Sequence, residues 1–127
     1  MRQARSRLPI IGKVRGRDIR CHTGDAVVTV SGALPCDCVF HAVGPDMNRQ
    51  EYKGRRGVDL AMKRLDDTYR NTMKRAEENN VKVIAFSIIC GGAFRGKTMT
   101  RAQVIGLGLQ MISTWAYKGL EHVFFCA

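Results

Sequence analysis

Two glycine-containing turns, each directly after an apolar stretch, carry the residue types best suited to bind a phosphate. The first comprises Cys90, Gly91, Gly92, Ala93, Phe94 and Arg95, and the second comprises Gly44, Pro45 and Asp46. Without a β-carbon, a glycine lets backbone N–H groups approach an anion at the carboxyl end of a strand. Phe94 is suited to cover a sugar or base, and Arg95 or Lys97 to neutralise a phosphate. We predict a ligand site at these turns, and the alternative is that the glycines only shape tight bends.

The first turn also matches the phosphate-binding loop of nucleoside triphosphatases, because Gly91 is followed at the required spacing by Gly96-Lys97-Thr98. Such enzymes also need an acidic residue at the end of another strand, where it holds magnesium through water. The chain after Thr98 contains one apolar stretch, and this stretch ends without a carboxylate. A P-loop NTPase built on residues 91–98 is therefore kept as an alternative.

Three single polar residues are weaker candidates for chemistry, and a structural role is the simpler interpretation of each. His41 lies within an apolar stretch, which favours a packed histidine over a general base. Asp25 follows Gly24, an arrangement typical of a turn or cap. His22 is a candidate phosphate contact, but one histidine beside a cysteine does not make a metal site. The sequence leaves the catalytic residues, and whether the protein is an enzyme, unknown.

The five cysteines favour free thiols over a metal centre. They are an odd number without a Cys-x-x-Cys pair, and the spacing of Cys36 and Cys38 matches no common zinc site. We therefore expect no metal and no cofactor. Reduced, mostly buried thiols are typical of an intracellular protein, cytoplasmic or nuclear.

The chain is basic, and its charge is concentrated in two segments. Lys and Arg number 21 against 11 Asp and Glu, a net charge of +10. Seven of the basic residues lie in residues 1–20 with one acid, Asp18, and a second cluster comprises Arg49, Lys53, Arg55 and Arg56. These segments are either solvated loops or a contact surface for an anionic partner such as RNA. For residues 1–20 a mitochondrial presequence is a further alternative. Neither a membrane-spanning window nor a secretory signal is visible, so we expect no membrane partner.

Hydrophobic periodicity predicts the elements that must position the turns. Ala26–Val30 and residues 37–43 are β-branched and apolar, and their short connection predicts an antiparallel pair. A helix follows, with one apolar face and a stop at Asn79-Asn80; the face comprises Val58, Met62, Leu65, Tyr69, Thr72 and Ala76. Residues 1–20 are predicted to hold one short helix or a loosely attached arm.

The second half of the chain predicts a strand, a helix and a strand. Residues 83–89 are almost continuously apolar, as expected of a parallel strand covered on both faces. Thr98 or Thr100 is then predicted to cap a helix that ends near Gly119, with a core face of Ile105, Leu109, Ile112 and Ala116. His122–Cys126 is the last strand. Helices that alternate with apolar strands predict an α/β sandwich in one domain.

The order of these motifs resembles the macro domain family. The family pattern of Cys-x-Thr-Gly-acid-Ala, then Leu-Pro, then His-x-Val-Gly-Pro is matched at residues 21–26, Leu34-Pro35 and residues 41–45. Residues 65–76 are similar to a helix of that family, and residues 84–94 to its strand and glycine loop. The resemblance implies a three-layer α/β/α sandwich with a mixed sheet over residues 21–127. It also implies that Cys90, Gly91, Gly92, Ala93 and Phe94 wrap the diphosphate and distal ribose of ADP-ribose.

Two departures from the family pattern qualify this expectation. Cys90 and Gly91 stand where hydroxyl residues are usual, which removes hydroxyl contacts but keeps the backbone donors. Residues 1–20 also lack the family's adenine-binding aspartate, asparagine-rich strand and glycine-rich helix start, so we expect a domain truncated at its N-terminus with a basic arm or helix remnant there. The missing strand resembles one between the strands of His41 and Phe86, so we expect a closed gap, a strand borrowed from an oligomer or partner, or a partial domain.

These observations leave several functions open. The first is a module that binds ADP-ribose, a related nucleotide diphosphate or an ADP-ribosylated protein, with or without catalysis. The others are a hydrolase that releases ADP-ribose, a degenerate macro fold that binds RNA through its basic arm, and the P-loop NTPase of residues 91–98.

Overall fold

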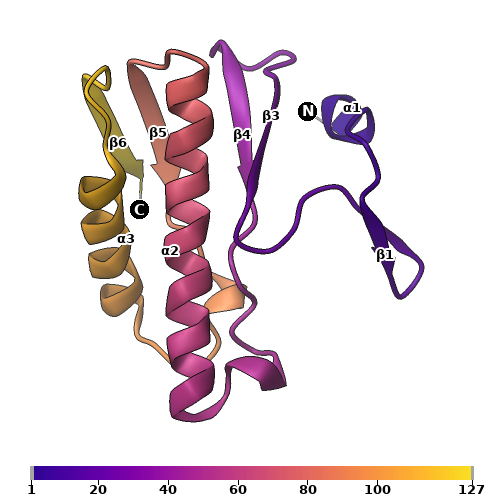
Figure 1. Cartoon of the computed structure of the whole chain (residues 1–127), viewed down its shortest axis with the longest axis vertical. Helices are drawn as coiled ribbons and strands as arrows, with labels where there is room; N and C mark the ends of the chain where they lie inside the picture. The colour runs from indigo at the N-terminus through magenta and orange to yellow at the C-terminus, as the bar shows by residue number, and fades with distance from the viewer. Residues whose placement is uncertain (1, 127) are drawn as a thin grey trace.

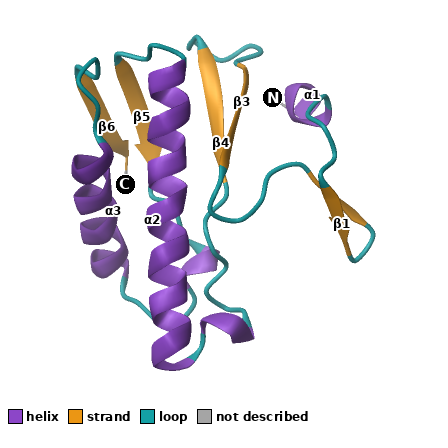
Figure 2. Cartoon of the chain, in the orientation of Figure 1, coloured by secondary structure: helices purple, strands orange, loops and turns teal. Residues whose placement is uncertain are grey.

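The strands of the described residues form two-stranded sheets, and two of the helices pack against four of these strands. A computed structural model describes residues 2–126. In chain order the elements are α1 (Arg2–Ser6), β1 (Gly12–Val14), β2 (Arg17–Ile19), β3 (Ala26–Val30), β4 (Cys38–Ala42), the 3-10 turn η1 (Gln50–Tyr52), α2 (Gly54–Glu78), β5 (Val83–Ser87), the 3-10 turn η2 (Ala93–Arg95), α3 (Arg101–Trp115) and β6 (His122–Cys126). Their arrangement is shown in Figure 1 and Figure 2. None of the helices in residues 2–126 combines the length and hydropathy that crossing a bilayer requires.

The pairing is both antiparallel and parallel, as the family resemblance implies. β3 and β4 are antiparallel, with Val28 opposite Phe40. β5 and β6 are parallel, with Ala85 opposite Phe124. The predicted strand over residues 37–43 is shorter than expected, since Asp37 lies in the preceding bend.

The long helix α2 lies against both strand pairs and forms the centre of the core (Figure 1). Leu65, Tyr69 and Ala76, predicted on its apolar face, are fully buried. The ring of Tyr69 lies 5.6 Å from that of Phe86 on β5. The predicted stop is confirmed, because Asn80 adopts a left-handed φ of 54° after the last helical turn.

The expectation that residues 83–89 are covered on both faces is wrong. Ile84 and Phe86 are buried against the helices. On the other face of β5 and β6, Val83 is 53% exposed and Phe124, which lies opposite Ala85, is 58% exposed. The described residues therefore supply the sheet strands and one helical layer, formed by α2 and α3.

The predicted core face of α3 is right at Ile112, which is buried, and wrong at Leu109 and Ala116, which are exposed. Its buried residues are Val104, Gly108, Met111 and Ile112, whereas Leu109 is 49% exposed. The reason is the close approach of Tyr69 and Phe125 to Gly108, which turns that face of the helix inward. The helix ends at Trp115, before the predicted stop at Gly119.

Residues 2–20 form more than the single helix or arm that the sequence predicts. After α1, the strands β1 and β2 make a hairpin whose turn has Arg15 and Gly16 at positive φ, 50° and 75°. Positive φ at both central residues is typical of a two-residue hairpin turn, but Arg-Gly is not one of the pairs that signal such a turn, so the sequence did not predict it. Figure 1 shows the hairpin projecting away from the helices and the other strands.

Candidate functional site

The two predicted turns lie against each other and are joined by hydrogen bonds. The N–H of Met47 donates to the carbonyl of Phe94 at 2.7 Å. Asn48 donates from Nδ2 to the carbonyl of Ala93 at 2.8 Å. The Oδ1 of Asp46 accepts from both N–H groups of Asn48 and so holds the amide in place. The structure therefore brings the predicted residues 44–46 and 90–95 into one site.

Gly44 and Cys90 form the closest contact between the turns. A β-carbon at Gly44 would lie 2.6 Å from both Cys90 Sγ and Ile89 Cγ2, so no larger residue fits there. The Cys90 thiol is buried and donates to the carbonyl of Pro45 at 3.1 Å. Burial, with a smaller contribution from Asp46, raises the pKa of Cys90 to about 12. Cys90 is thus a neutral packing residue.

The first turn presents backbone donors, though fewer than the glycines alone suggest. Gly91 donates its N–H to the carbonyl of Ile88 at 3.2 Å and is not free. Within residues 2–126, the N–H groups of Gly92, Ala93 and Phe94 have no backbone acceptor. A β-carbon at Gly92 would meet nothing within 4 Å, so the backbone there is open to a ligand. Successive free N–H groups of this kind make an anion-binding turn.

A small hollow of about 160 Å³ lies beside this turn. The predicted residues that line it are Gly44, Asp46 and Phe94, whose ring is 50% exposed. Sequence reasoning did not assign the five other lining residues to the site: Thr23, Val43, Arg49, Glu51 and Tyr52. Arg49 could have been identified from the sequence, because it belongs to the second basic cluster. Tyr52 could not, since its place beside the turn depends on the packing of η1 against the start of α2.

Arg95 lies differently from the prediction. Its Nη1 donates to the carbonyl of Met99 at 2.7 Å, so the side chain stabilises the loop between the first turn and α3. A role of Arg95 as a phosphate ligand stays a prediction. The P-loop interpretation of residues 91–98 is not supported, because α3 begins at Arg101 and is capped by Thr100 rather than starting at Lys97-Thr98.

His41 and Asp25 make local hydrogen bonds of the kind expected of structural residues. His41 Nε2 lies 2.7 Å from the Thr29 hydroxyl across the strand pair. Burial, and then the charge of Arg5, lowers the pKa of His41. Asp25 accepts from the N–H of Ala26 at 2.8 Å and caps the start of β3. Within residues 2–126 no group of three or more His, Cys, Asp or Glu side chains is arranged to hold a metal ion.

The fold and the paired turns define an α/β protein with two glycine-containing turns in contact at the carboxyl ends of its strands. A family model described as Macro domain matches residues 10–105, and the chain therefore belongs to the macro domain family. The resemblance read from the motifs is thus confirmed.

Named relatives agree with this assignment. The chain is 38% identical over 115 residues to an O-acetyl-ADP-ribose deacetylase of Escherichia fergusonii, covering 89% of this chain and 59% of that protein. It is 34% identical over 109 residues to the ADP-ribose glycohydrolase MACROD2 of Mus musculus, covering 84% of this chain and 21% of that protein. The chain thus spans less than two thirds of the length of these relatives.

Solved structures show the same fold. The Oceanobacillus iheyensis macrodomain with ADP superposes with a TM-score of 0.66 at 24% identity, over 85% of this chain and 53% of that one. The macro domain of ganglioside induced differentiation associated protein 2 gives a TM-score of 0.69 at 24% identity, over 84% of this chain and 50% of that one.

Proposed function

We propose that this protein binds ADP-ribose, or a derivative that carries its diphosphate, at the paired turns of residues 44–46 and 90–94. The observation that carries the proposal is the row of backbone N–H groups at Gly92, Ala93 and Phe94 that have no backbone acceptor, of which Phe94 lines the hollow. Support comes from solved macrodomains described as bound to ADP and to ADPR. Relatives named for O-acetyl-ADP-ribose or ADP-ribose support the same ligand class.

The size of the hollow limits how much of the ligand it holds. Sites for small molecules usually enclose about 300–1,000 Å³. A hollow of about 160 Å³ therefore encloses only part of the ligand, on the scale of its diphosphate, with the rest of the nucleotide outside it. Weak affinity follows, and the exposed ring of Phe94 supplies much of the apolar contact.

Calorimetry with ADP-ribose at physiological salt tests this function, with Phe94→Ala as the diagnostic variant. The substitution keeps the backbone donor and removes the exposed ring, and we expect the affinity to fall about tenfold. Leu109→Ala is the matched control, because Leu109 is equally exposed but lies on α3 away from the turns. Absence of heat with folded protein refutes the function, and equal affinities of the two variants refute the site.

Hydrolysis of an ADP-ribose derivative is a second proposal, supported by the names of the relatives. Incubation with O-acetyl-ADP-ribose, followed by mass spectrometry of the nucleotide, detects loss of the acetyl group. Turnover above the spontaneous rate supports hydrolysis, and its absence in protein that binds ADP-ribose leaves a binding module.

RNA binding through the N-terminal arm is a third proposal, and the projecting hairpin favours it. Arg15 and Arg17 are exposed there, with Arg5 and Arg7 on or next to α1. Titration of labelled RNA at increasing salt is the test, since phosphate contacts lose affinity steeply as salt rises. Affinity that is insensitive to salt, or to Arg15→Glu, contradicts this proposal. An intracellular location stays a prediction.

A further inference from the structure

A cluster of four exposed basic residues adjoins the candidate site. The cluster comprises Arg49, Lys53, Arg55 and Arg56. Arg49 lines the small hollow beside the paired turns, whereas Arg55 and Arg56 lie in the first turn of α2. Figure 1 shows α2 beginning at the end of the molecule toward which β4 and β5 point. The cluster therefore extends from the edge of the hollow to the start of α2.

The charges of this cluster are unpaired, unlike those further along α2. Lys63 and Arg70 lie 3.3 and 3.0 Å from the carboxylate of Asp67. Arg75 lies 3.3 Å from the carboxylate of Glu78. Within residues 2–126, no Asp or Glu carboxylate lies within 4.0 Å of a cation of the cluster. Cations at the start of a helix also lower its stability, because the helix dipole is positive there. Neither local pairing nor helix stability accounts for these charges.

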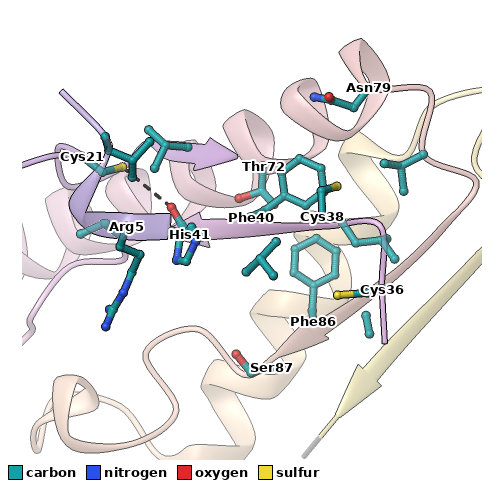
Figure 3. Close-up of a pocket in the computed structure, with 18 of the residues that line it drawn as sticks. Arg5, Cys21, Cys36, Cys38, Phe40, His41, Thr72, Asn79, Phe86 and Ser87 are labelled. Atoms are coloured by element: carbon teal, nitrogen blue, oxygen red, sulfur yellow. Dashed lines mark hydrogen bonds between the residues drawn. The ribbon is translucent and has the colours of Figure 1, made fainter. Parts of the chain in front are cut away.

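The larger hollow of the molecule is separate from the cluster. It has a volume of about 1440 Å³ and lies between β4 and β5, which do not pair with each other within residues 2–126. Phe40, Thr72 and Phe86 line it, as Figure 3 shows. The gap expected between the strands of His41 and Phe86 is thus open. None of the four basic residues lines this hollow, so the cluster is associated with the candidate site alone.

The ligand is larger than the small hollow, and the remainder of it passes over the surrounding surface. The hollow measures about 160 Å³ and encloses a part on the scale of the diphosphate. Arg49 borders it, so a group attached to the ligand on that side meets the cluster. Unpaired surface charges act over about 10 Å at moderate salt. Arg55 and Arg56 therefore attract anionic groups that lie outside the hollow.

We propose that this basic cluster binds acidic side chains of a protein segment to which ADP-ribose is attached, so that the site prefers modifications flanked by acidic residues. This preference rests on the proposed function, because it concerns the same ADP-ribose site. A guanidinium group matches a carboxylate in shape and donates two parallel N–H bonds to it. Arg55 and Arg56 are the specificity-determining residues, since they belong to the cluster but do not line the hollow.

Two features of the cluster favour an acidic protein segment over a nucleic acid. Single-stranded nucleic acids stack their bases on exposed aromatic rings. Residues 46–60 contain one aromatic residue, Tyr52, which is only 4% exposed. Glu51 lies exposed within the cluster and repels a continuous phosphate backbone. A peptide with separate carboxylates is able to place them beside the arginines and away from Glu51.

The probe is ADP-ribose joined through its reducing end to an aminooxy peptide in a stable oxime linkage. Three conjugates differ only in the residues beside the linkage, which are glutamates, glutamines or lysines. By calorimetry at about 50 mM salt, we expect the glutamate conjugate to bind about fivefold more tightly than the glutamine conjugate. The lysine conjugate should bind more weakly than both. This difference should vanish at about 0.5 M salt, where surface charges are screened.

The protein-side variant is the double substitution Arg55→Gln/Arg56→Gln. Glutamine has a helix propensity close to that of arginine, so the variant should fold. We expect it to lose the preference for glutamate and to bind free ADP-ribose as the wild type does. Lys74→Gln/Lys118→Gln is the matched control, because it removes the same charge at two exposed positions. Lys74 lies about 27 Å along α2 from Arg56, and Lys118 follows α3.

The outcomes separate this preference from the proposed function. Absence of binding of free ADP-ribose by folded protein overturns both. Binding of free ADP-ribose with equal affinity for the three conjugates overturns the preference alone, as does an equal loss in the two double variants. Tighter binding of an oligonucleotide conjugate of the same charge assigns the cluster to nucleic acid and also overturns the preference. The comparison of conjugates on the wild type keeps the test decisive if the arginine variant does not fold.

Discussion

At the scale of single residues, Gly44 and Gly92 lie in the two turns of the candidate site, but the space available for a side chain differs between them. A β-carbon at Gly44 would lie 2.6 Å from Cys90 Sγ and Ile89 Cγ2, whereas one at Gly92 would meet nothing within 4 Å. Gly44→Ala should therefore push the turns apart and lower the melting temperature by on the order of 5 °C. Gly92→Ala should lower it less, because the added β-carbon meets no neighbouring atom. Calorimetric melting of both variants is the measurement, and equal shifts contradict this account of the contact.

Single residues also show what the sequence identifies at this site and what it does not. The glycines and Phe94 were found because a glycine-rich turn after an apolar strand is a local pattern. The direction of the Arg95 side chain was not predicted, because it depends on the carbonyl of Met99 in the folded loop. The hydrogen bond of the Gly91 N–H was not predicted either, because it depends on the carbonyl of Ile88. Residue type predicted the place of the site better than it predicted which groups are free to bind.

At the scale of elements, the two glycines inside α3 provide a matched pair. A β-carbon at Gly108 would lie 2.7 Å from Tyr69 Oη and 3.1 Å from Phe125 Cζ, whereas Gly106 has open space. Gly106→Ala should stabilise the protein by up to about 1 kcal/mol through helix propensity. Gly108→Ala should destabilise it by about 1 kcal/mol, because crowding of the ring exceeds that gain. Urea denaturation of both variants gives the two free energies, and a stabilising Gly108→Ala would contradict the packing described.

The start of α3 gives a second test at this scale. Thr100 accepts from the N–H of Gln103 at 3.1 Å, and the Gln103 side chain accepts from the N–H of Thr100 at 2.8 Å. Thr100→Ala should remove this reciprocal cap and cost about 1 kcal/mol of unfolding free energy. Thr98→Ala is the control, because Thr98 lies before the helix and does not cap it. Equal losses in thermal melts of the two variants would show that the cap is misassigned.

Elements were predicted best where a pattern is local. The strand Ala26–Val30 and the stop of α2 at Asn79-Asn80 were found at their positions, since β-branched runs and left-handed asparagines act on their own neighbours. The buried face of α3 was not predicted, because Gly108 rather than Leu109 faces inward as a result of its contact with Tyr69, which is far away in the sequence. The open face of β5 was missed for a similar reason: apolar sequence does not show whether a covering layer lies within the described residues.

At the scale of the whole molecule, thiol and phenol groups that burial keeps protonated should make the folded state less stable at alkaline pH. Burial raises the pKa of Cys90 from 9.0 to about 12, of Tyr69 from 10.0 to about 12 and of Cys21 from 9.0 to about 11. The folded state therefore holds protons that the unfolded chain releases above pH 9. A raised folded pKa gives a contribution that is complete below the unfolded pKa and is lost as pH rises toward the folded value. We expect the free energy of unfolding to fall progressively from about pH 9 to pH 12.

Urea denaturation at several pH values between 8 and 11 measures this fall, and Tyr69→Phe identifies one source of it. The phenylalanine ring keeps most of the packing against Phe86 but has no hydroxyl to ionise. The variant should therefore follow the wild-type curve up to about pH 10 and then lose stability less steeply, because the unfolded tyrosine no longer releases a proton there. Parallel curves above pH 10 would show that Tyr69 ionises equally in both states, and that the contact between α2, α3 and β6 around its hydroxyl is open to water.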